Sequence, residues 1–114
     1  MVVEDDQSLL GALVFALEAE GFRVAAHTTA EAVLDGPVAA DCLVVDLKLP
    51  AMDGLSLIAR LRERNVNAPA ILITTNPDDR VKAAAQARGV LIVEKPLIGG
   101  ELRRRIDEAV ARRA

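Results

Sequence analysis

Acidic side chains are concentrated directly after the first apolar segment of this sequence. Glu4, Asp5 and Asp6 are consecutive, and they follow Val2 and Val3. Clustered carboxylates raise one another's pKa unless a cation compensates their charge. A hard divalent ion with oxygen ligands would do this, and Mg²⁺ suits a site with few carboxylates, several waters and a phosphate oxygen. The cluster therefore predicts half of a metal site.

The elements that would position these acids alternate along the chain. Short apolar, β-branched runs are typical of strands, and longer stretches with helical spacing separate them. The runs are nearly continuous, as expected for a parallel sheet that helices cover on both faces. This pattern predicts five βα units in one α/β domain. The predicted strands are MVV at 1–3, FRVAA at 22–26, CLVVDL at 42–47, AILIT at 70–74 and VLIVE at 90–94.

Composition favours a small globular domain and excludes several other classes of protein. The chain has 114 residues, of which 52% are hydrophobic, and this length is typical of one domain. A net charge of −3 gives no support to nucleic-acid binding. No segment has the pattern of a signal peptide or a membrane anchor. The single cysteine, Cys42, cannot form an internal disulfide. We therefore expect one cytoplasmic domain over residues 1–114, with no effector domain and no membrane contact.

Side chains that can do chemistry also stand at the ends of later predicted strands. Asp46 lies in the third run, Thr74 ends the fourth, and Lys95 follows the fifth. In an open parallel sheet, ligands bind beyond the carboxyl ends of the strands, where the strand order reverses. We therefore expect these three side chains to converge with the acids that follow the first strand.

An aspartate in such a crevice can act as a nucleophile. Carboxylates accept phosphoryl groups in aspartyl-phosphate intermediates, and Asp46 closes a buried strand, where an unpaired charge is costly. Lys95 and Mg²⁺ would neutralise the charge on the equatorial phosphoryl oxygens. The Thr74 hydroxyl would donate a hydrogen bond to one of them. The residues thus favour Mg²⁺-dependent transfer of a phosphoryl group to Asp46.

Four short motifs, taken together, resemble the receiver domain of bacterial response regulators. They are VVED at 2–5, VVDLKLPAMDG at 44–54, ILIT at 71–74 and VEKP at 93–96, in the order and spacing of that family. The ending EKP is similar to that of the FixJ-like regulators. The resemblance implies a flavodoxin-like, doubly wound fold with five helices and five parallel strands in the order 2-1-3-4-5.

The resemblance also implies a role for each site residue. Asp46 would be the phosphoacceptor of a phosphorelay, with a phosphohistidine on a sensor kinase or phosphotransfer protein as the donor. Thr74 would be the switch hydroxyl, and Lys95 the partner of the phosphate. The domain would be a signalling module, which promotes its own phosphorylation and dephosphorylation and is compatible with homodimer formation. The implied metal ligands are Asp5 and Asp46, Glu4 through a water molecule, and the backbone carbonyl of Lys48.

Two positions depart from the family pattern. Thr75 stands where Ala or Gly is usual, directly after the switch threonine. Ile92 stands where the family often has Tyr or Phe, three residues before the lysine. Both departures bear on how the domain transmits its state, whereas the phosphorylation chemistry does not depend on them.

Three other functions fit parts of the sequence. A haloacid-type phosphatase would need a second acid two residues after Asp46, where Lys48 stands. A flavin or nucleotide carrier would need a phosphate-binding loop after the first strand, where acids would repel phosphate. The remaining alternative is a pseudo-receiver, an interaction module of the same fold that signals without phosphorylation. The presence of the full set of site residues argues against it.

Several of these residues also have purely structural interpretations. Glu4 and Asp5, taken alone, are more often helix-capping acids than metal ligands. Asp6 is expected to cap the first helix. Cys42 is expected to be a small buried side chain, and His27 a solvated residue that follows the second strand.

Overall fold

One parallel sheet of five strands organises the structure, a computed structural model that describes residues 1–97 and 100–113. The strand order is β2-β1-β3-β4-β5, which confirms the predicted doubly wound fold. All four pairs of neighbouring strands are parallel. The strands are β1 (Val2–Val3), β2 (Ala26–His27), β3 (Leu43–Asp46), β4 (Ala70–Thr74) and β5 (Leu91–Glu94).

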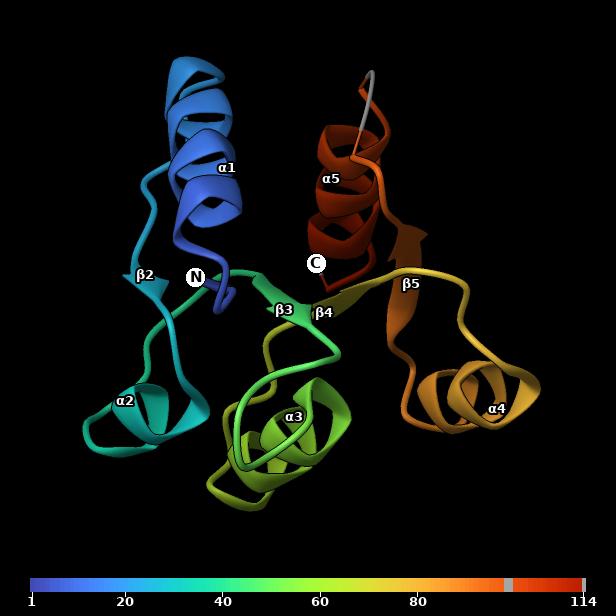
Figure 1. Ribbon diagram of the computed structural model, residues 1–114. Coiled ribbons are helices and arrows are strands. Elements are labelled where there is room, and N and C mark those ends of the chain that lie inside the picture. The colour runs from blue at the N-terminus through green and yellow to red at the C-terminus, as the bar shows by residue number, and fades with distance from the viewer. Residues whose placement is uncertain (98–99, 114) are drawn as a thin grey trace.

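Five helices cover the two faces of the sheet (Figure 1). Helices α1 and α5 lie on one face, and α2, α3 and α4 lie on the other. None of the helices in the described part of the chain has the length and hydropathy needed to cross a membrane. The helices are α1 (Gln7–Ala19), α2 (Ala30–Leu34), α3 (Gly54–Glu63), α4 (Asp79–Ala87) and α5 (Glu101–Arg113).

The buried core is divided by the sheet into two clusters. Val2 and Val44 pack on the side of α1 and α5, and Val3 and Val45 pack on the side of α2 and α3. Successive strand residues point to opposite faces, so a strand covered on both sides must be apolar at every position. This requirement explains the nearly continuous apolar runs in the sequence.

Side-chain caps fix the points at which several helices begin. Asp6 accepts hydrogen bonds from the amides of Ser8 and Leu9 at 3.0 and 3.1 Å, which confirms its predicted capping role. Asp53 accepts from the Ser56 amide at 2.7 Å, at the start of α3. Such caps satisfy amides that have no partner within the helix. The loop after β1 and the loop between β3 and α3 therefore end at defined positions beside the sheet.

The second strand is shorter than the sequence predicts, and it is shifted along the chain. The run FRVAA predicts a strand at 22–26, but β2 contains only Ala26 and His27. This strand is at the edge of the sheet and pairs only with β1, which supplies two partner residues. Residues 22–25 lie beyond the paired part of β1, so they form no ladder.

His27 and Cys42 also differ in position or burial from what the sequence predicts. His27 is half-buried within β2, and its carbonyl accepts a hydrogen bond from the Glu4 amide at 3.0 Å. It pairs with Val3 and so belongs to the sheet, whereas the sequence predicts a solvated position after the strand. Cys42 is only partly buried, because it precedes β3 at the margin of the core.

Candidate functional site

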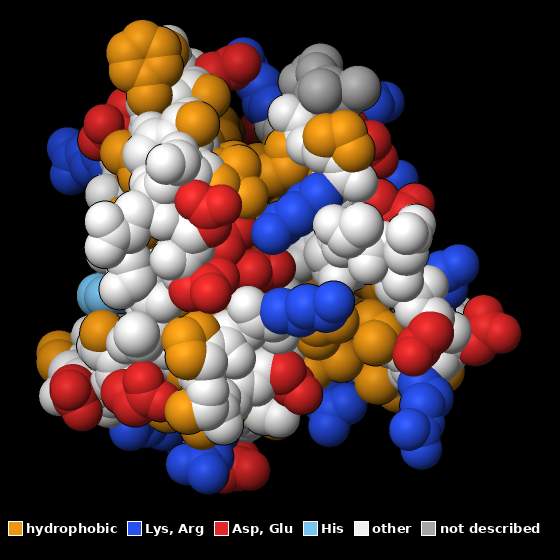
Figure 2. All heavy atoms as spheres, in the orientation of Figure 1, with side chains coloured by type: hydrophobic (Ala, Val, Ile, Leu, Met, Phe, Trp, Pro, Cys, Tyr) orange, Lys and Arg blue, Asp and Glu red, His pale blue; other side chains and the backbone are white. Residues whose placement is uncertain are grey.

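Three carboxylates converge at the carboxyl ends of β1 and β3. Each of Glu4, Asp5 and Asp46 offers an oxygen, and these oxygens all lie within 4.8 Å of one another. Glu4 and Asp5 follow β1 directly, and Asp46 is the last residue of the neighbouring strand β3. Figure 2 shows acidic side chains gathered near the centre of one face, with Lys and Arg side chains beside them. The structure thus brings together the three acids that the sequence analysis selected.

Glu4 is held in a fully buried position by its neighbours. Its side chain has 0% exposure, and its Oε2 atom accepts a hydrogen bond from the Asp6 amide at 3.2 Å. Burial raises the pKa of Glu4 to about 7, although hydrogen bonds from Lys95 and from the Asp6 amide act in the opposite direction. A cation at the site would favour the ionised form of this carboxyl group.

Lys95 connects the end of β5 with the acids. Its Nζ atom lies 3.0 Å from Glu4 Oε1 and 3.3 Å from Asp46 Oδ1. Burial lowers the pKa of the Lys95 ammonium, but the contacts with Glu4 and Asp46 outweigh it, and the pKa lies above its ordinary value. Lys95 therefore carries its positive charge directly beside Asp46, which is only 4% exposed.

Thr74 lies at the same edge of the sheet. It is the last residue of β4 and is 2% exposed. The preceding residue, Ile73, pairs with Asp46. The carbonyl of Thr74 accepts a hydrogen bond from the Lys95 amide at 2.8 Å. The next residue, Thr75, is exposed. The register therefore places the Thr74 backbone next to both Asp46 and Lys95.

The loop after β3 brings a further backbone group and a glycine to this edge. Among the described residues, the carbonyl of Lys48 accepts no hydrogen bond, so its oxygen is available to another partner. The amide of Gly54 donates to the Leu47 carbonyl at 2.8 Å. A Cβ atom at Gly54 would lie 2.3 Å from the backbone oxygen of Asp46 and 2.9 Å from Val45 Cγ1. Only glycine permits this approach without displacing the strand end that carries Asp46.

Sequence reasoning did not identify Gly54 as a site residue. The signal was present, since Gly54 closes the motif VVDLKLPAMDG directly after the capping residue Asp53. Glycine between an aspartate and an apolar helix is also common for reasons of turn geometry alone. The requirement becomes visible only when the distance to Asp46 is known.

The donor set fits a hard divalent cation. Three carboxylates and a backbone carbonyl supply oxygen ligands only, which Mg²⁺ prefers over nitrogen and sulfur. Two of the acids are buried, and a buried carboxylate needs a compensating charge. Lys95 supplies one positive charge for the three acids, so the cluster has capacity for a further cation.

The site lies at the reversal point of the sheet, because β1 is flanked by β2 and β3. This position, with an acidic crevice and a lysine at the carboxyl ends of parallel strands, defines a doubly wound α/β domain with a ligand site at its switch point. The family described as response regulator receiver domain matches residues 1–107. The chain therefore belongs to the response regulator receiver domain family, and it is a receiver of the two-component signalling type.

Individual relatives support this assignment, including the predicted similarity to FixJ. The transcriptional regulatory protein FixJ of Azorhizobium caulinodans is 35% identical over 98 residues, which cover 83% of this chain and 46% of that protein. The sensory transduction protein RegX3 of Mycobacterium tuberculosis is 36% identical over 122 residues, covering 99% of this chain and 50% of that protein. The chain thus spans about half the length of the curated relatives it matches.

Solved structures agree with the fold. A CheY-like response regulator receiver domain protein from Methanospirillum hungatei has a TM-score of 0.89 at 24% identity, with 97% of this chain and 91% of that chain covered. The BeF3-activated DrrB receiver domain has a TM-score of 0.85 at 26% identity, with 96% and 94% covered. These neighbours confirm the flavodoxin-like arrangement of strands and helices.

Proposed function

We propose that Asp46 is the phosphoacceptor of this receiver and that its phosphorylation changes the affinity of the domain for a partner. The observation that carries this proposal is the convergence of three carboxylates with Lys95, whose Nζ atom lies 3.3 Å from Asp46 Oδ1. Family membership supplies the chemical context. The geometry supplies a candidate residue for each part of the reaction.

The donor in this proposal is a phosphohistidine on a sensor histidine kinase or a histidine phosphotransfer protein. A carboxylate oxygen of Asp46 attacks the phosphorus, a P–O bond forms, and the P–N bond breaks. The electron pair of that bond returns to the imidazole nitrogen of the donor. Lys95 donates hydrogen bonds to a phosphoryl oxygen and stabilises the charge of the transition state. The Thr74 hydroxyl donates to another phosphoryl oxygen.

The acids have the role of holding the metal ion. Asp5 and Asp46 would bind it directly, Glu4 through a water molecule, and Lys48 through its backbone carbonyl. When bound, Mg²⁺ would neutralise charge on the phosphoryl oxygens and so lower the barrier to transfer. Before transfer, Lys95 limits the repulsion between Glu4 and Asp46 through its contacts at 3.0 and 3.3 Å.

The domain in this proposal is a switch that promotes its own phosphorylation and dephosphorylation. A phosphate on Asp46 can shift the population of two states only by its differential interaction with them. Thr74 and Lys95 lie at the same edge of the sheet as Asp46, so both can respond to a phosphate on Asp46. We place the reaction in a cytoplasmic setting, where the lone Cys42 would remain reduced.

A small phosphoryl donor tests the proposal without knowledge of the kinase. The 114-residue chain is incubated with acetyl phosphate and Mg²⁺, and its intact mass is measured. The mass should increase by one phosphoryl group, and both EDTA and the substitution Asp46→Asn should prevent the increase. Asp35→Asn is the matched control, because Asp35 is exposed at the end of α2, and this variant should be phosphorylated normally. Full labelling of Asp46→Asn would contradict the proposal, and no labelling of the folded wild-type chain would favour a pseudo-receiver.

A further inference from the structure

Three non-glycine residues in the described part of the chain have a positive φ. They are Ala51 at 66°, Asn65 at 65° and Asn76 at 45°. This left-handed region is uncommon for residues with a Cβ atom, so each case has a cause in the surrounding structure. Ala51 lies in the loop after β3, which ends at Asp46, and Asn76 lies in the loop after β4, which ends at Thr74. Two of the three positions therefore adjoin site residues.

The conformation of Asn65 is explained by the end of α3. The Asn65 amide donates to the Arg62 carbonyl at 3.0 Å, and the Val66 amide donates to the Leu61 carbonyl at 2.9 Å. These two bonds form the common left-handed helix terminus, a position at which asparagine is well tolerated. Asn65 is thus held by local hydrogen bonds, far from the acids.

Asn76 has no such local support. At Ala51, the Met52 amide donates to the Pro50 carbonyl at 2.7 Å and closes a tight turn around the residue. Over residues 1–97 and 100–113, by contrast, neither the backbone nor the side chain of Asn76 forms a hydrogen bond. The positive φ of Asn76 is therefore imposed by the two ends of its loop.

Both ends of this loop are fixed. Thr74 belongs to β4 and is buried, with 2% exposure. Asp78 caps α4, since its side chain accepts a hydrogen bond from the Val81 amide at 2.9 Å. Residues 75–77 alone connect the strand to this cap. The change of direction between β4 and α4 therefore falls on three residues.

Pro77 leaves most of this change to the residue before it. The proline ring fixes its own φ at roughly −65°, and its Cδ atom favours an extended preceding residue, with φ at about −120°. Asn76 lies outside that range, at 45°. The short connection thus imposes on Asn76 a conformation that both its own Cβ atom and Pro77 disfavour.

The arrangement of the sheet determines how this loop would respond to movement at the site. β4 lies between β3, which carries Asp46, and β5, and α4 lies beside β5, away from β3 (Figure 1). Movement of Thr74 toward Asp46 would therefore lengthen the path to the cap of α4. A helical residue advances the chain by about 1.5 Å and an extended residue by about 3.3 Å, so conversion of Asn76 to an extended conformation supplies this length.

We propose that Asn76 is a strained hinge, which is left-handed in the unphosphorylated domain and becomes extended when Asp46 is phosphorylated. This proposal rests on the proposed function, in which the Thr74 hydroxyl donates to a phosphoryl oxygen. The conversion brings Asn76 into the range that Pro77 favours. The released strain then adds to the preference for the phosphorylated state, because it differs between the two states.

Opposite substitutions at residue 76 of the full chain test the proposal, with beryllofluoride as the phosphoryl mimic. Asn76→Gly adopts a positive φ without strain and stabilises the free state, so it should weaken the apparent affinity for beryllofluoride by roughly fivefold. Asn76→Val opposes a positive φ and should strengthen this affinity. Pro77→Ala keeps the Asn76 side chain but removes the restriction, so it should weaken the affinity as Asn76→Gly does. NMR titration at saturating Mg²⁺ gives the affinities.

Asn65 provides the matched controls, because it is the same residue type with a positive φ at the end of α3. Asn65→Gly and Asn65→Val should shift the urea midpoint of unfolding and leave the affinity for beryllofluoride unchanged. In the wild-type chain, the backbone chemical shifts of Asn76 should change from left-handed to extended values when beryllofluoride binds. A role in stability alone would not produce this change.

Several results would overturn the proposal. Asn76→Gly and Asn76→Val could change the affinity in the same direction, or Asn76 could keep left-handed chemical shifts in the bound form. Wild-type affinity in Pro77→Ala would also overturn it, because the effect of residue 76 would then come from its side chain. If Asn76→Val does not fold, Asn76→Gly and Pro77→Ala still decide the matter. Failure of the wild-type chain to bind beryllofluoride would overturn the proposed function, and this proposal with it.

Discussion

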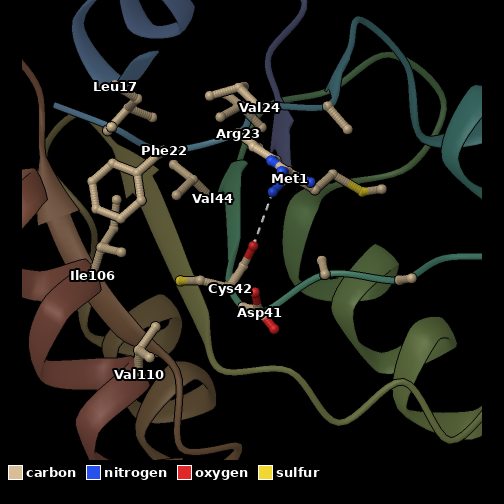
Figure 3. A pocket seen from close by; sticks show the side chains of 15 residues that line it. Met1, Leu17, Phe22, Arg23, Val24, Asp41, Cys42, Val44, Ile106 and Val110 are labelled. Atoms are coloured by element: carbon tan, nitrogen blue, oxygen red, sulfur yellow. Dashed lines mark hydrogen bonds between the residues drawn. The ribbon is translucent and has the colours of Figure 1, made fainter. Parts of the chain in front are cut away.

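The two ends of β1 and β3 have opposite chemistry within one sheet. At the carboxyl ends, Glu4 and Asp46 are buried polar groups, and Lys95 contacts both of them. At the amino ends, Met1 and Cys42 line a cavity of about 630 Å³ with mainly apolar walls, and the Met1 nitrogen donates a hydrogen bond to the Cys42 carbonyl at 3.0 Å (Figure 3). The first end presents charged side chains, and the second presents mainly apolar side chains. The same parallel strands therefore end in two surfaces of different chemistry.

The two ends of these strands also differ in the space that is available for an added side-chain atom. The cavity end has space beside the strands, whereas at the acidic end Gly54 lies in direct contact with the Asp46 backbone. A Cβ atom at Gly54 would lie 2.3 Å from the Asp46 carbonyl oxygen. Asp46 is thus positioned by main-chain packing as well as by its contact with Lys95.

The largest effect is expected from Gly54→Ala. The added methyl group must displace the end of β3, so the free energy of unfolding should fall by about 1–3 kcal/mol, and phosphorylation of Asp46 should slow. Gly11→Ala is the matched control, because Gly11 lies on α1 with nothing within 4 Å of an added Cβ. This control should gain roughly 0.5–1 kcal/mol from helix propensity. Urea unfolding and the initial rate of labelling by acetyl phosphate measure both effects, and equal rates for the two variants would contradict the positioning role of Gly54.

A smaller effect is expected when the pH is changed, because the protonation of Glu4 should alter the apparent affinity for Mg²⁺. The pKa of Glu4 is raised from an ordinary 4.5 to about 7, so the folded protein binds this proton more tightly than the unfolded chain does. The stability that this proton contributes is complete below pH 4.5 and is lost as the pH rises through 7. Mg²⁺ requires ionised ligands, so its apparent affinity should weaken by up to about tenfold per pH unit below 7. Titration calorimetry at pH 6 and pH 8 measures this, and Glu4→Gln should reduce the difference. An affinity equal at both pH values would contradict the assignment of Glu4 to the metal site.

The lifetime of the phosphorylated state should respond more modestly to Thr75→Ala. Thr75 follows the buried Thr74 and is exposed, so its branched side chain can restrict the approach of water to the phosphate. Its removal should speed the loss of phosphate from Asp46 by a few-fold. Ser56→Ala, at an exposed position on α3, provides the control. Decay followed by intact mass at saturating Mg²⁺ gives the rates, and a slower decay for Thr75→Ala would show that this side chain does not shield the phosphate.

The smallest effect is expected at Ile92. This side chain is half-buried against the cluster on the side of α2, α3 and α4. β-Branching leaves it few rotamers, and it has no ring or hydroxyl group to expose. Addition of beryllofluoride should therefore shift amide NMR signals near Asp46 and in residues 74–80, with much smaller shifts at Ile92 and along α5. Equally large shifts in all these regions would show that isoleucine can transmit the change.

The alternation of strands and helices and the candidate residues at the strand ends were predictable because both depend on local patterns, whereas the strand order was predicted only through the resemblance to receiver domains. Apolar runs mark the strands, and Glu4, Asp46 and Lys95 each stand where such a run ends. The range of β2 was not predictable, since it depends on how many residues of β1 are available to pair. The importance of Gly54 also could not be predicted, because it depends on a close approach of two backbone segments. The contact between Lys95 and Glu4 joins residues 91 positions apart, which no local pattern specifies.

The most direct test of the central claim is to map the phosphorylated residue itself. The chain is phosphorylated with acetyl phosphate and Mg²⁺, then reduced with borohydride, which converts an aspartyl phosphate to homoserine, and its peptides are sequenced by mass spectrometry. We predict homoserine at position 46 alone, dependent on Mg²⁺ and strongly reduced in Lys95→Ala, where the neighbouring positive charge is lost. Homoserine at position 5 or at another exposed aspartate, with Asp46 unmodified, would contradict the account.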